Sequence, residues 1–178
     1  MKLDLYGWFP KENEIVLRNL IKDNNIKTVI EIGCFLGKST SFFVEQGCKV
    51  IAIDTFEGAS DLNDCKAVKK RLPTLFEQFK FNMRELGIED KVEVYKMRSE
   101  RAFYEFWEDC VDEVDMVYID GSHDYEDVWF DINNWQEMAK KVICGDDYTK
   151  HHDGVRKAVD DLLPDANKLN RVWYKIIK

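Results

Sequence analysis

Four aspartates stand where short apolar runs of the sequence end, and side chains in such positions can bind ligands or accept protons. Each follows a run rich in β-branched residues within three positions: Asp54, Asp120, Asp146 and Asp147. If these runs are strands of one parallel sheet, the aspartates lie together at its carboxyl edge, where open α/β sheets bind ligands. Carboxylates there can accept hydrogen bonds from ribose hydroxyls, hold a hard divalent cation or accept a proton.

A glycine loop, residues 33–37, provides the second chemical signal. It follows the apolar run 28–32 and precedes Lys38-Ser39-Thr40, which can begin a helix. A strand, a glycine turn and a helix N-terminus form a ligand cradle, because glycine lets the backbone approach the ligand and the first helical N–H groups point toward it. Two ligand classes fit this pattern, a phosphate and a nucleoside-type cofactor.

The loop is one residue too short for a nucleotide phosphate. Gly33 to Ser39 reads G-x-x-x-G-K-S, whereas the phosphate-binding pattern is G-x-x-x-x-G-K-[ST]. The full length is needed to wrap successive N–H groups around a phosphate. Glu31 would also face the polyanion, although Met116–Asp120 resembles the metal-binding strand of nucleotide hydrolases. A P-loop hydrolase therefore remains the remote alternative.

Asp54 favours the nucleoside instead. An acid that ends the second strand, about 20 residues beyond the glycine loop, can accept hydrogen bonds from both ribose hydroxyls. A nicotinamide cofactor would use the same acid, but its fingerprint is G-x-G-x-x-G. Here Phe35 occupies the position of the second glycine.

Four motifs then occur in order along the chain: Glu31-Ile-Gly33-Cys-Phe-Leu-Gly37-Lys-Ser39, Asp54-Thr-Phe-Glu-Gly58, Val117-Tyr-Ile-Asp120-Gly-Ser-His123-Asp-Tyr125 and Gly145-Asp146-Asp147-Tyr148. Together they resemble class I S-adenosylmethionine-dependent methyltransferases, and most closely the small O-methyltransferase-like branch that includes macrolide- and sugar-modifying enzymes. The resemblance spans about residues 7–177. It implies methyl transfer from S-adenosylmethionine to a hydroxyl of a small molecule, such as a sugar or a polyketide-like compound.

The resemblance also implies which residues bind the cofactor. The glycine loop would pack against the methionine part, Asp54 would bind the ribose, and Ser99 sits where this fold contacts adenine, with Met97 and Arg98 as alternatives. The cofactor-binding set is Glu31, Gly33, Cys34, Phe35, Gly37, Ser39, Asp54, Thr55, Phe56 and Ser99. Glu31 and Ser39 would hold the amino-acid end, and Thr55 and Phe56 would enclose the adenosine.

Catalysis and metal binding are expected after the fourth and fifth strands. Asp120 or His123 could take the proton of the acceptor hydroxyl. Asp120, Asp146 and Asp147 resemble the three carboxylates that bind Mg²⁺ in metal-dependent sugar O-methyltransferases, although the last two could merely cap the following loop. His151 and His152 could be a base, a substrate contact, a metal ligand or inert loop residues.

Some features depart from the family pattern. The usual lysine-proline-glycine-glycine turn before the fifth strand is reduced to Lys140-Lys141, and the C-terminal hairpin is short. A catalytically inactive cofactor-binding module that acts with a partner is therefore the alternative function. Substrate recognition is expected from residues 5–10, 58–72 and 148–153. A neighbouring subunit could supply a missing lid, which would make the protein a homo-oligomer.

Composition argues against other partners. A net charge of −8 and a pI near 5.0 disfavour a nucleic-acid or membrane-surface binder, because both need a basic face. Five scattered cysteines without a C-x-x-C pair fit reduced thiols in the cytoplasm. No segment approaches the roughly 18 apolar residues of a membrane span, and the start lacks a signal-peptide pattern.

The elements that would position these residues alternate along the chain. Periodicity predicts helices over residues 11–22, from the glycine loop to 46, and over 73–87, 100–109, 125–140 and 154–163, with Ile15 and Trp107 among the buried positions. It predicts strands over 27–32, 49–53, 92–95, 114–119, 141–144 and 172–177, the last preceded by a short partner near 166–169. Residues 58–72 are expected to be irregular.

This alternation predicts the fold class α/β, a three-layer, doubly wound, mainly parallel sheet of the Rossmann-like methyltransferase type with a short antiparallel C-terminal hairpin. The length fits one domain over residues 1–178. Residues 1–25 would form an N-terminal aromatic segment and helix, and residues 26–178 the Rossmann-like core.

Overall fold

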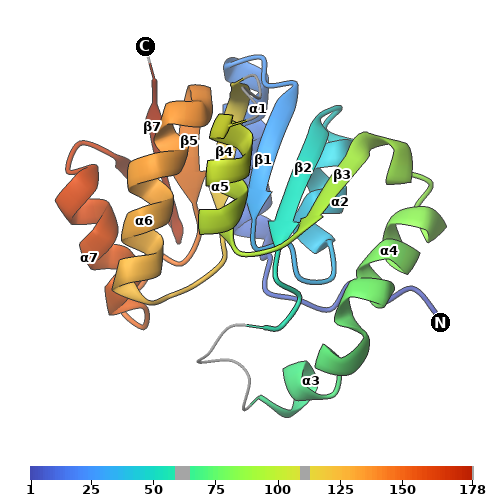
Figure 1. The fold of residues 1–178 in the computed structure, drawn as a ribbon. Helices are drawn as coiled ribbons and strands as arrows, with labels where there is room; N and C mark the ends of the chain where they lie inside the picture. The colour runs from blue at the N-terminus through green and yellow to red at the C-terminus, as the bar shows by residue number, and fades with distance from the viewer. Residues whose placement is uncertain (59–64, 109–112, 178) are drawn as a thin grey trace.

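The computed structural model describes residues 1–58, 65–108 and 113–177 (Figure 1). In this part of the chain seven strands form one sheet in the order β3-β2-β1-β4-β5-β7-β6. The strands are β1 (Thr28–Ile32), β2 (Lys49–Asp54), β3 (Val92–Lys96), β4 (Val114–Ile119), β5 (Ala139–Gly145), β6 (Asn167–Leu169) and β7 (Val172–Ile176). The first five are parallel to one another, and β7 is antiparallel to both β5 and β6.

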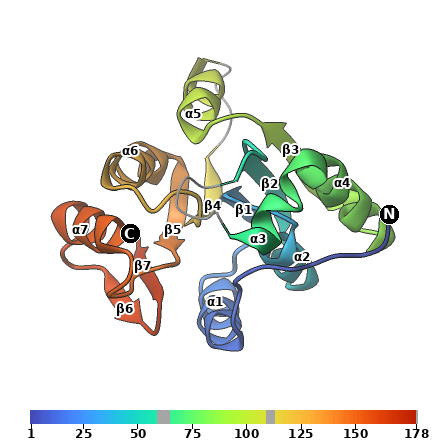
Figure 2. The same ribbon diagram turned by 90° about the horizontal axis from the view of Figure 1, so that it is seen from below.

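Helices cover both faces of this sheet (Figures 1 and 2). They are α1 (Lys11–Asp23), α2 (Lys38–Glu45), α3 (Lys66–Lys69), α4 (Leu75–Glu85), α5 (Ser99–Glu108), α6 (Tyr125–Trp135) and α7 (Asp153–Leu162). Buried side chains of α1, α2 and α4 pack on one face, and those of α5, α6 and α7 pack on the other. The expected three-layer, doubly wound α/β fold with its antiparallel C-terminal pair is confirmed.

The strands supply both cores because successive side chains of a strand point to opposite faces. In β4, Met116 and Tyr118 belong to the core beneath α1 and α2, whereas Val117 and Ile119 belong to the core beneath α5 and α6. All four are buried. A strand that is buried on both faces reads as a continuous apolar run, which is why the sequence identified it.

The register of the strands sets the position of the site. Ile32 at the end of β1 pairs with Ile53 in β2 and with Ile119 at the end of β4. Ile119 in turn pairs with Gly145 at the end of β5. The residues that follow these four positions therefore emerge at one edge of the sheet.

Two side chains that were expected to be buried are exposed. Ile15 is 61% exposed, because the buried stripe of α1 runs through Val16 and Leu17 instead. Trp107 is 63% exposed and stacks on the outside of Phe103, with the ring centroids 6.0 Å apart. Both residues lie one helical position beside the stripe that faces the core.

Two predicted boundaries were also wrong. The helix expected to reach residue 140 ends at Trp135, because residues Gln136–Met138 form a 3-10 turn and β5 begins at Ala139. The segment 58–72 contains the short helix α3, so it is not irregular throughout. Residues 59–64 of that segment, the expected helix end at Asp109, and Cys110 lie outside the described residues.

The four described cysteines are free thiols: Cys34, Cys48, Cys65 and Cys144. Among the described residues, no helix combines the length and the apolar character that crossing a membrane requires.

Candidate active site

The glycine loop between β1 and α2 depends on close backbone contacts. Gly33 has a φ of +87°, and a Cβ on it would lie 2.2 Å from the backbone oxygen of Asp120. Gly37 has a φ of +84°, and a Cβ on it would lie 2.3 Å from the Cε of Met83. Only glycine adopts this conformation without strain and leaves room for both contacts. The loop therefore brings the ends of β1 and β4 together.

Asp54 holds the glycine loop from the neighbouring strand. Its Oδ2 accepts hydrogen bonds from the backbone N–H groups of Cys34 at 3.0 Å and Phe35 at 2.8 Å. Its Oδ1 accepts one from the N–H of Phe56 at 2.6 Å. Burial raises the pKa of Asp54, although these three donors oppose the rise. Asp54 thus fixes the loop and also lines the cavity beside it.

Glu31 is buried and lies outside the cavity lining. Its carboxylate accepts hydrogen bonds from the hydroxyl of Ser39 and from that of Thr40, the latter at 2.5 Å. Burial raises the pKa of Glu31 to about 7. The structure places Glu31 beneath the first turn of α2, where Ser39 lies between it and the cavity. Its contact with a cofactor stays a prediction.

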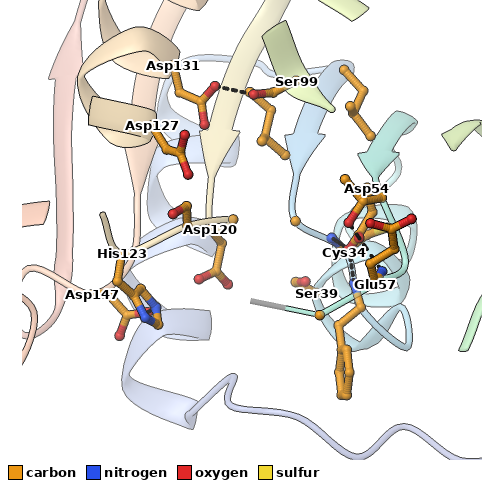
Figure 3. Close-up of a pocket in the computed structure, with 18 of the residues that line it drawn as sticks. Cys34, Ser39, Asp54, Glu57, Ser99, Asp120, His123, Asp127, Asp131 and Asp147 are labelled. Atoms are coloured by element: carbon orange, nitrogen blue, oxygen red, sulfur yellow. Dashed lines mark hydrogen bonds and ion pairs between the residues drawn. The ribbon is translucent and has the colours of Figure 1, made fainter. Parts of the chain in front are cut away.

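A cavity of about 820 Å³ lies along the carboxyl edge of the sheet. Ten of the residues proposed from the sequence line it: Gly33, Cys34, Phe35, Ser39, Asp54, Thr55, Ser99, Asp120, His123 and Asp147. Four others do not: Glu31, Gly37, Phe56 and Asp146. The volume falls in the range of small-molecule and cofactor sites. Figure 3 shows the two sides of the cavity, with Asp54 and Glu57 facing Asp120, His123 and Asp147.

Ser99 and Asp131 meet in the upper part of Figure 3. The hydroxyl of Ser99 donates a hydrogen bond to Oδ1 of Asp131, which is buried and lines the cavity. Burial raises the pKa of Asp131 to about 7. Asp131 was not predicted from the sequence, although an acid between Val128 and Ile132 on the buried face of α6 is a readable signal.

The three carboxylates after β4 and β5 do come together. One oxygen from each of Asp120, Asp146 and Asp147 lies within 4.8 Å of the others. However, Arg171 donates from Nε to Oδ1 of Asp146 at 2.9 Å and from Nη2 to Oδ1 of Asp147. Asn13 donates to Oδ2 of Asp146 at 2.7 Å. Both oxygens of Asp146 thus already accept hydrogen bonds.

Asp120 differs from its two neighbours. Burial raises its pKa well above the ordinary value, and the charges of Asp146 and Asp147 raise it further. The hydroxyl of Tyr118 donates to its Oδ2 at 3.2 Å. Because a raised pKa makes a carboxylate a stronger base, Asp120 at the cavity wall can accept a proton from a bound ligand.

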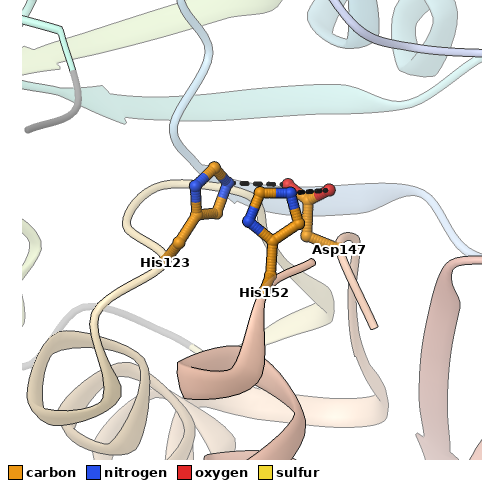
Figure 4. Close-up of side chains that lie close together, drawn as sticks. All are labelled: His123, Asp147 and His152. Carbon is orange, nitrogen blue, oxygen red and sulfur yellow. Dashed lines mark hydrogen bonds and ion pairs between the residues drawn. The ribbon is translucent and has the colours of Figure 1, made fainter. Parts of the chain in front are cut away.

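Two histidines approach Asp147 from different loops (Figure 4). Nε2 of His123 lies 2.8 Å from Oδ2 of Asp147, and Nε2 of His152 lies 3.5 Å from Oδ1. Burial opposes ionisation of Asp147, yet the hydrogen bond from His123 and the charge of Arg171 hold its pKa below the ordinary value. His151 is exposed and lies outside this group.

The cavity thus lies at the carboxyl edge of a Rossmann-like sheet, the fold that the sequence predicts for a methyltransferase. A family model described as "Methyltransferase domain" matches residues 30–148, about two thirds of the chain. The chain therefore belongs to the methyltransferase domain family. A sequence comparison with curated proteins found no significant match.

Several solved structures share the fold. An O-methyltransferase from Bacillus cereus in complex with SAH is 15% identical, with a TM-score of 0.72 over 99% of this chain and 84% of that chain. A putative caffeoyl-CoA O-methyltransferase from Staphylococcus aureus is 17% identical, with a TM-score of 0.70 over 97% and 86%. The O-methyltransferase TomG from Streptomyces achromogenes, in complex with SAM, is 15% identical, with a TM-score of 0.69 over 98% and 83%.

Proposed function

We propose that residues 1–178 act as one domain that transfers a methyl group from S-adenosylmethionine to a hydroxyl of a small molecule, such as a sugar or a polyketide-like compound. One observation carries this proposal. The glycine loop with Asp54, and the proton acceptor Asp120, line the same cavity from different strands. A cofactor beside the glycine loop and Asp54 would present its methyl group to an acceptor beside Asp120.

The lining residues support a specific cofactor placement. The loop residues Cys34 and Phe35 would lie beside the methionine part, with the Ser39 hydroxyl near its amino-acid end. Asp54 would accept hydrogen bonds from the ribose hydroxyls, because each carboxylate oxygen has more than one acceptor site. Ser99 would lie at the adenine. Glu31 would then act through Ser39 instead of touching the cofactor.

Methyl transfer is an in-line displacement at the methyl carbon. The acceptor oxygen forms a bond to that carbon, the carbon–sulfur bond breaks, and the sulfur keeps the electron pair. The protein must align the two molecules and take the hydroxyl proton. We assign that proton to Asp120, whose raised pKa and position in the cavity suit the role. His123 is the second candidate, since Asp147 orients its ring.

The resemblance also implies a divalent cation at Asp120, Asp146 and Asp147. A cation there would lower the pKa of the acceptor hydroxyl. The oxygens are close enough, but Arg171 already donates hydrogen bonds to Asp146 and Asp147, and Asn13 donates to the other oxygen of Asp146. Magnesium would have to displace the guanidinium, so the three-carboxylate set fits the ion poorly. The proposed transfer therefore relies on Asp120, with His123 as the second candidate, and on no cation.

A transfer assay tests the proposal. The chain is incubated with S-adenosylmethionine and a panel of hydroxylated acceptors, and release of S-adenosylhomocysteine is measured. We expect release with at least one acceptor and a loss of about 100-fold or more in Asp120→Asn, since a positioned base contributes on that order. Asp23→Asn, which changes an exposed acid at the end of α1 that is not among the residues lining the cavity, is the control. Cofactor binding without release for any acceptor would favour the inactive-module alternative.

A further inference from the structure

We infer that His123, Asp147 and His152 form a binding site for a divalent transition-metal ion, with two imidazole nitrogens and one carboxylate as ligands. This set differs from the three carboxylates that the family resemblance implies. It shares only Asp147 with them, and because Arg171 donates to Oδ1 of Asp147, the ligand atom would be Oδ2, which faces His123. The inference does not depend on methyl transfer, because metal binding can be measured without cofactor or acceptor.

The donor atoms are close enough to serve one ion. One ligand atom from each of the three residues lies within 4.8 Å of the others. Two ligands of one ion, each with a bond of about 2.1 Å, lie at most roughly 4.2 Å apart, so only small rotations are needed. The two imidazole rings lie side by side, with centroids 3.9 Å apart (Figure 4).

Three loops bring these side chains together. His123 follows β4, Asp147 follows β5, and His152 immediately precedes α7. Gly154 permits this arrangement, since a Cβ on it would lie 2.2 Å from the backbone oxygen of His123. The start of α7 is thus packed directly against the His123 loop, and the two histidines are held on the same side of Asp147.

The ligand chemistry favours a transition metal over Mg²⁺ or Ca²⁺. Imidazole nitrogen suits Zn²⁺, Ni²⁺ and similar borderline ions, whereas hard cations prefer oxygen ligands. The side chains of His123 and His152 are 14% and 24% exposed, and both line the cavity, so an ion can reach them. With a metal on His123, Asp120 would be left as the proton acceptor.

The test is a metal titration of the full chain without cofactor. Co²⁺ is added first, because its d–d absorption reports nitrogen ligation. Calorimetric titrations with Zn²⁺ and Mg²⁺ follow. We expect one Zn²⁺ per chain, bound about 100-fold or more tightly than Mg²⁺, and at least about 10-fold weaker binding in His152→Ala.

His151→Ala is the matched control, because it removes the neighbouring, exposed imidazole that lies outside the group. We expect it to bind Zn²⁺ like the wild type. His123→Gln is a second test variant, and thermal unfolding without metal checks that each variant folds. Equal losses in His151→Ala and His152→Ala would overturn the inference. So would Mg²⁺ binding as tight as that of Zn²⁺ and lost in Asp120→Asn, which would assign the ion to the three carboxylates and leave the proposed methyl transfer intact.

Discussion

The stability of the fold depends on pH through Glu31, which accepts hydrogen bonds from Ser39 and Thr40 in the helix that follows the glycine loop. Its folded-state pKa is about 7, against an ordinary value of 4.5. Between these two values only the folded chain holds the proton, so the free energy of unfolding falls as pH rises through this window. At 1.36 kcal/mol for each pKa unit, the loss amounts to about 3 kcal/mol. Below pH 4.5 both states are protonated and the stabilisation is fully present.

Urea unfolding at several pH values between 4.5 and about 7 measures this dependence. We expect Glu31→Gln to remove much of the slope, because glutamine cannot ionise, yet its amide oxygen can accept from one hydroxyl and its NH2 group can donate to the other. Burial also raises the pKa of Asp131, so Asp131→Asn should remove a separate part of the pH dependence of the free energy of unfolding. A Glu31→Gln slope identical to that of the wild type would show that Glu31 is ionised in the folded state.

At this scale the sequence predicts residue types better than it predicts their partners. Asp54 and Asp120 could be placed at the sheet edge because each ends a recognisable strand. Arg171 could not, because it stands in no motif. Arg171 lies beside Asp146 because β7 pairs antiparallel with β5, with Trp173 opposite Gly145. Such contacts depend on tertiary pairing.

At the scale of elements, the turn after β1 depends on space as well as on backbone conformation. Gly33 and Gly47 have nearly the same φ, +87° and +86°. A Cβ on Gly33 would meet the backbone of Asp120, whereas a Cβ on Gly47 would meet nothing within 4 Å. An alanine at Gly47 would therefore cause backbone strain alone, whereas an alanine at Gly33 would cause backbone strain and steric overlap.

We expect Gly47→Ala to lower the free energy of unfolding by about 1 kcal/mol, the cost of a left-handed alanine. Gly33→Ala should cost about 3 kcal/mol or more, since two strand ends must move apart. Urea unfolding of the ligand-free chain measures both changes. Equal losses would mean that the strand ends adjust freely, and the close approach of β1 and β4 would then not be essential.

The elements themselves were largely predictable, because alternating apolar runs and helical periodicity reflect local burial. The boundary between α6 and β5 was not. Residues Gln136–Met138 continue the helical periodicity of α6, but the pairing of Ala139 with Val114 begins the strand there. Long-range pairing decides that boundary, and no local pattern reports it.

At the scale of the whole molecule, the sheet order gathers residues from distant parts of the chain around one cavity. Ligand binding there should stabilise the entire fold. S-adenosylhomocysteine at about 100 times its Kd adds about 2.7 kcal/mol to the free energy of unfolding. For a chain of this size the Tm should rise by roughly 5 to 10 °C. A thermal-shift titration checks this rise, and ATP with Mg²⁺ should produce none. An equal rise with ATP would revive the nucleotide-hydrolase alternative.

Calorimetric titration of S-adenosylhomocysteine into the wild type, Asp54→Ala and Lys38→Ala tests the central claim most directly. We expect the wild type to bind one ligand per chain and Asp54→Ala to bind it about 10-fold or more weakly, the effect of one or two charge-assisted hydrogen bonds. Lys38 donates to the backbone oxygen of Gly7 at 3.3 Å, so Lys38→Ala should change the affinity by only a few-fold. No binding by the wild type, or equal losses in both variants, would contradict the account.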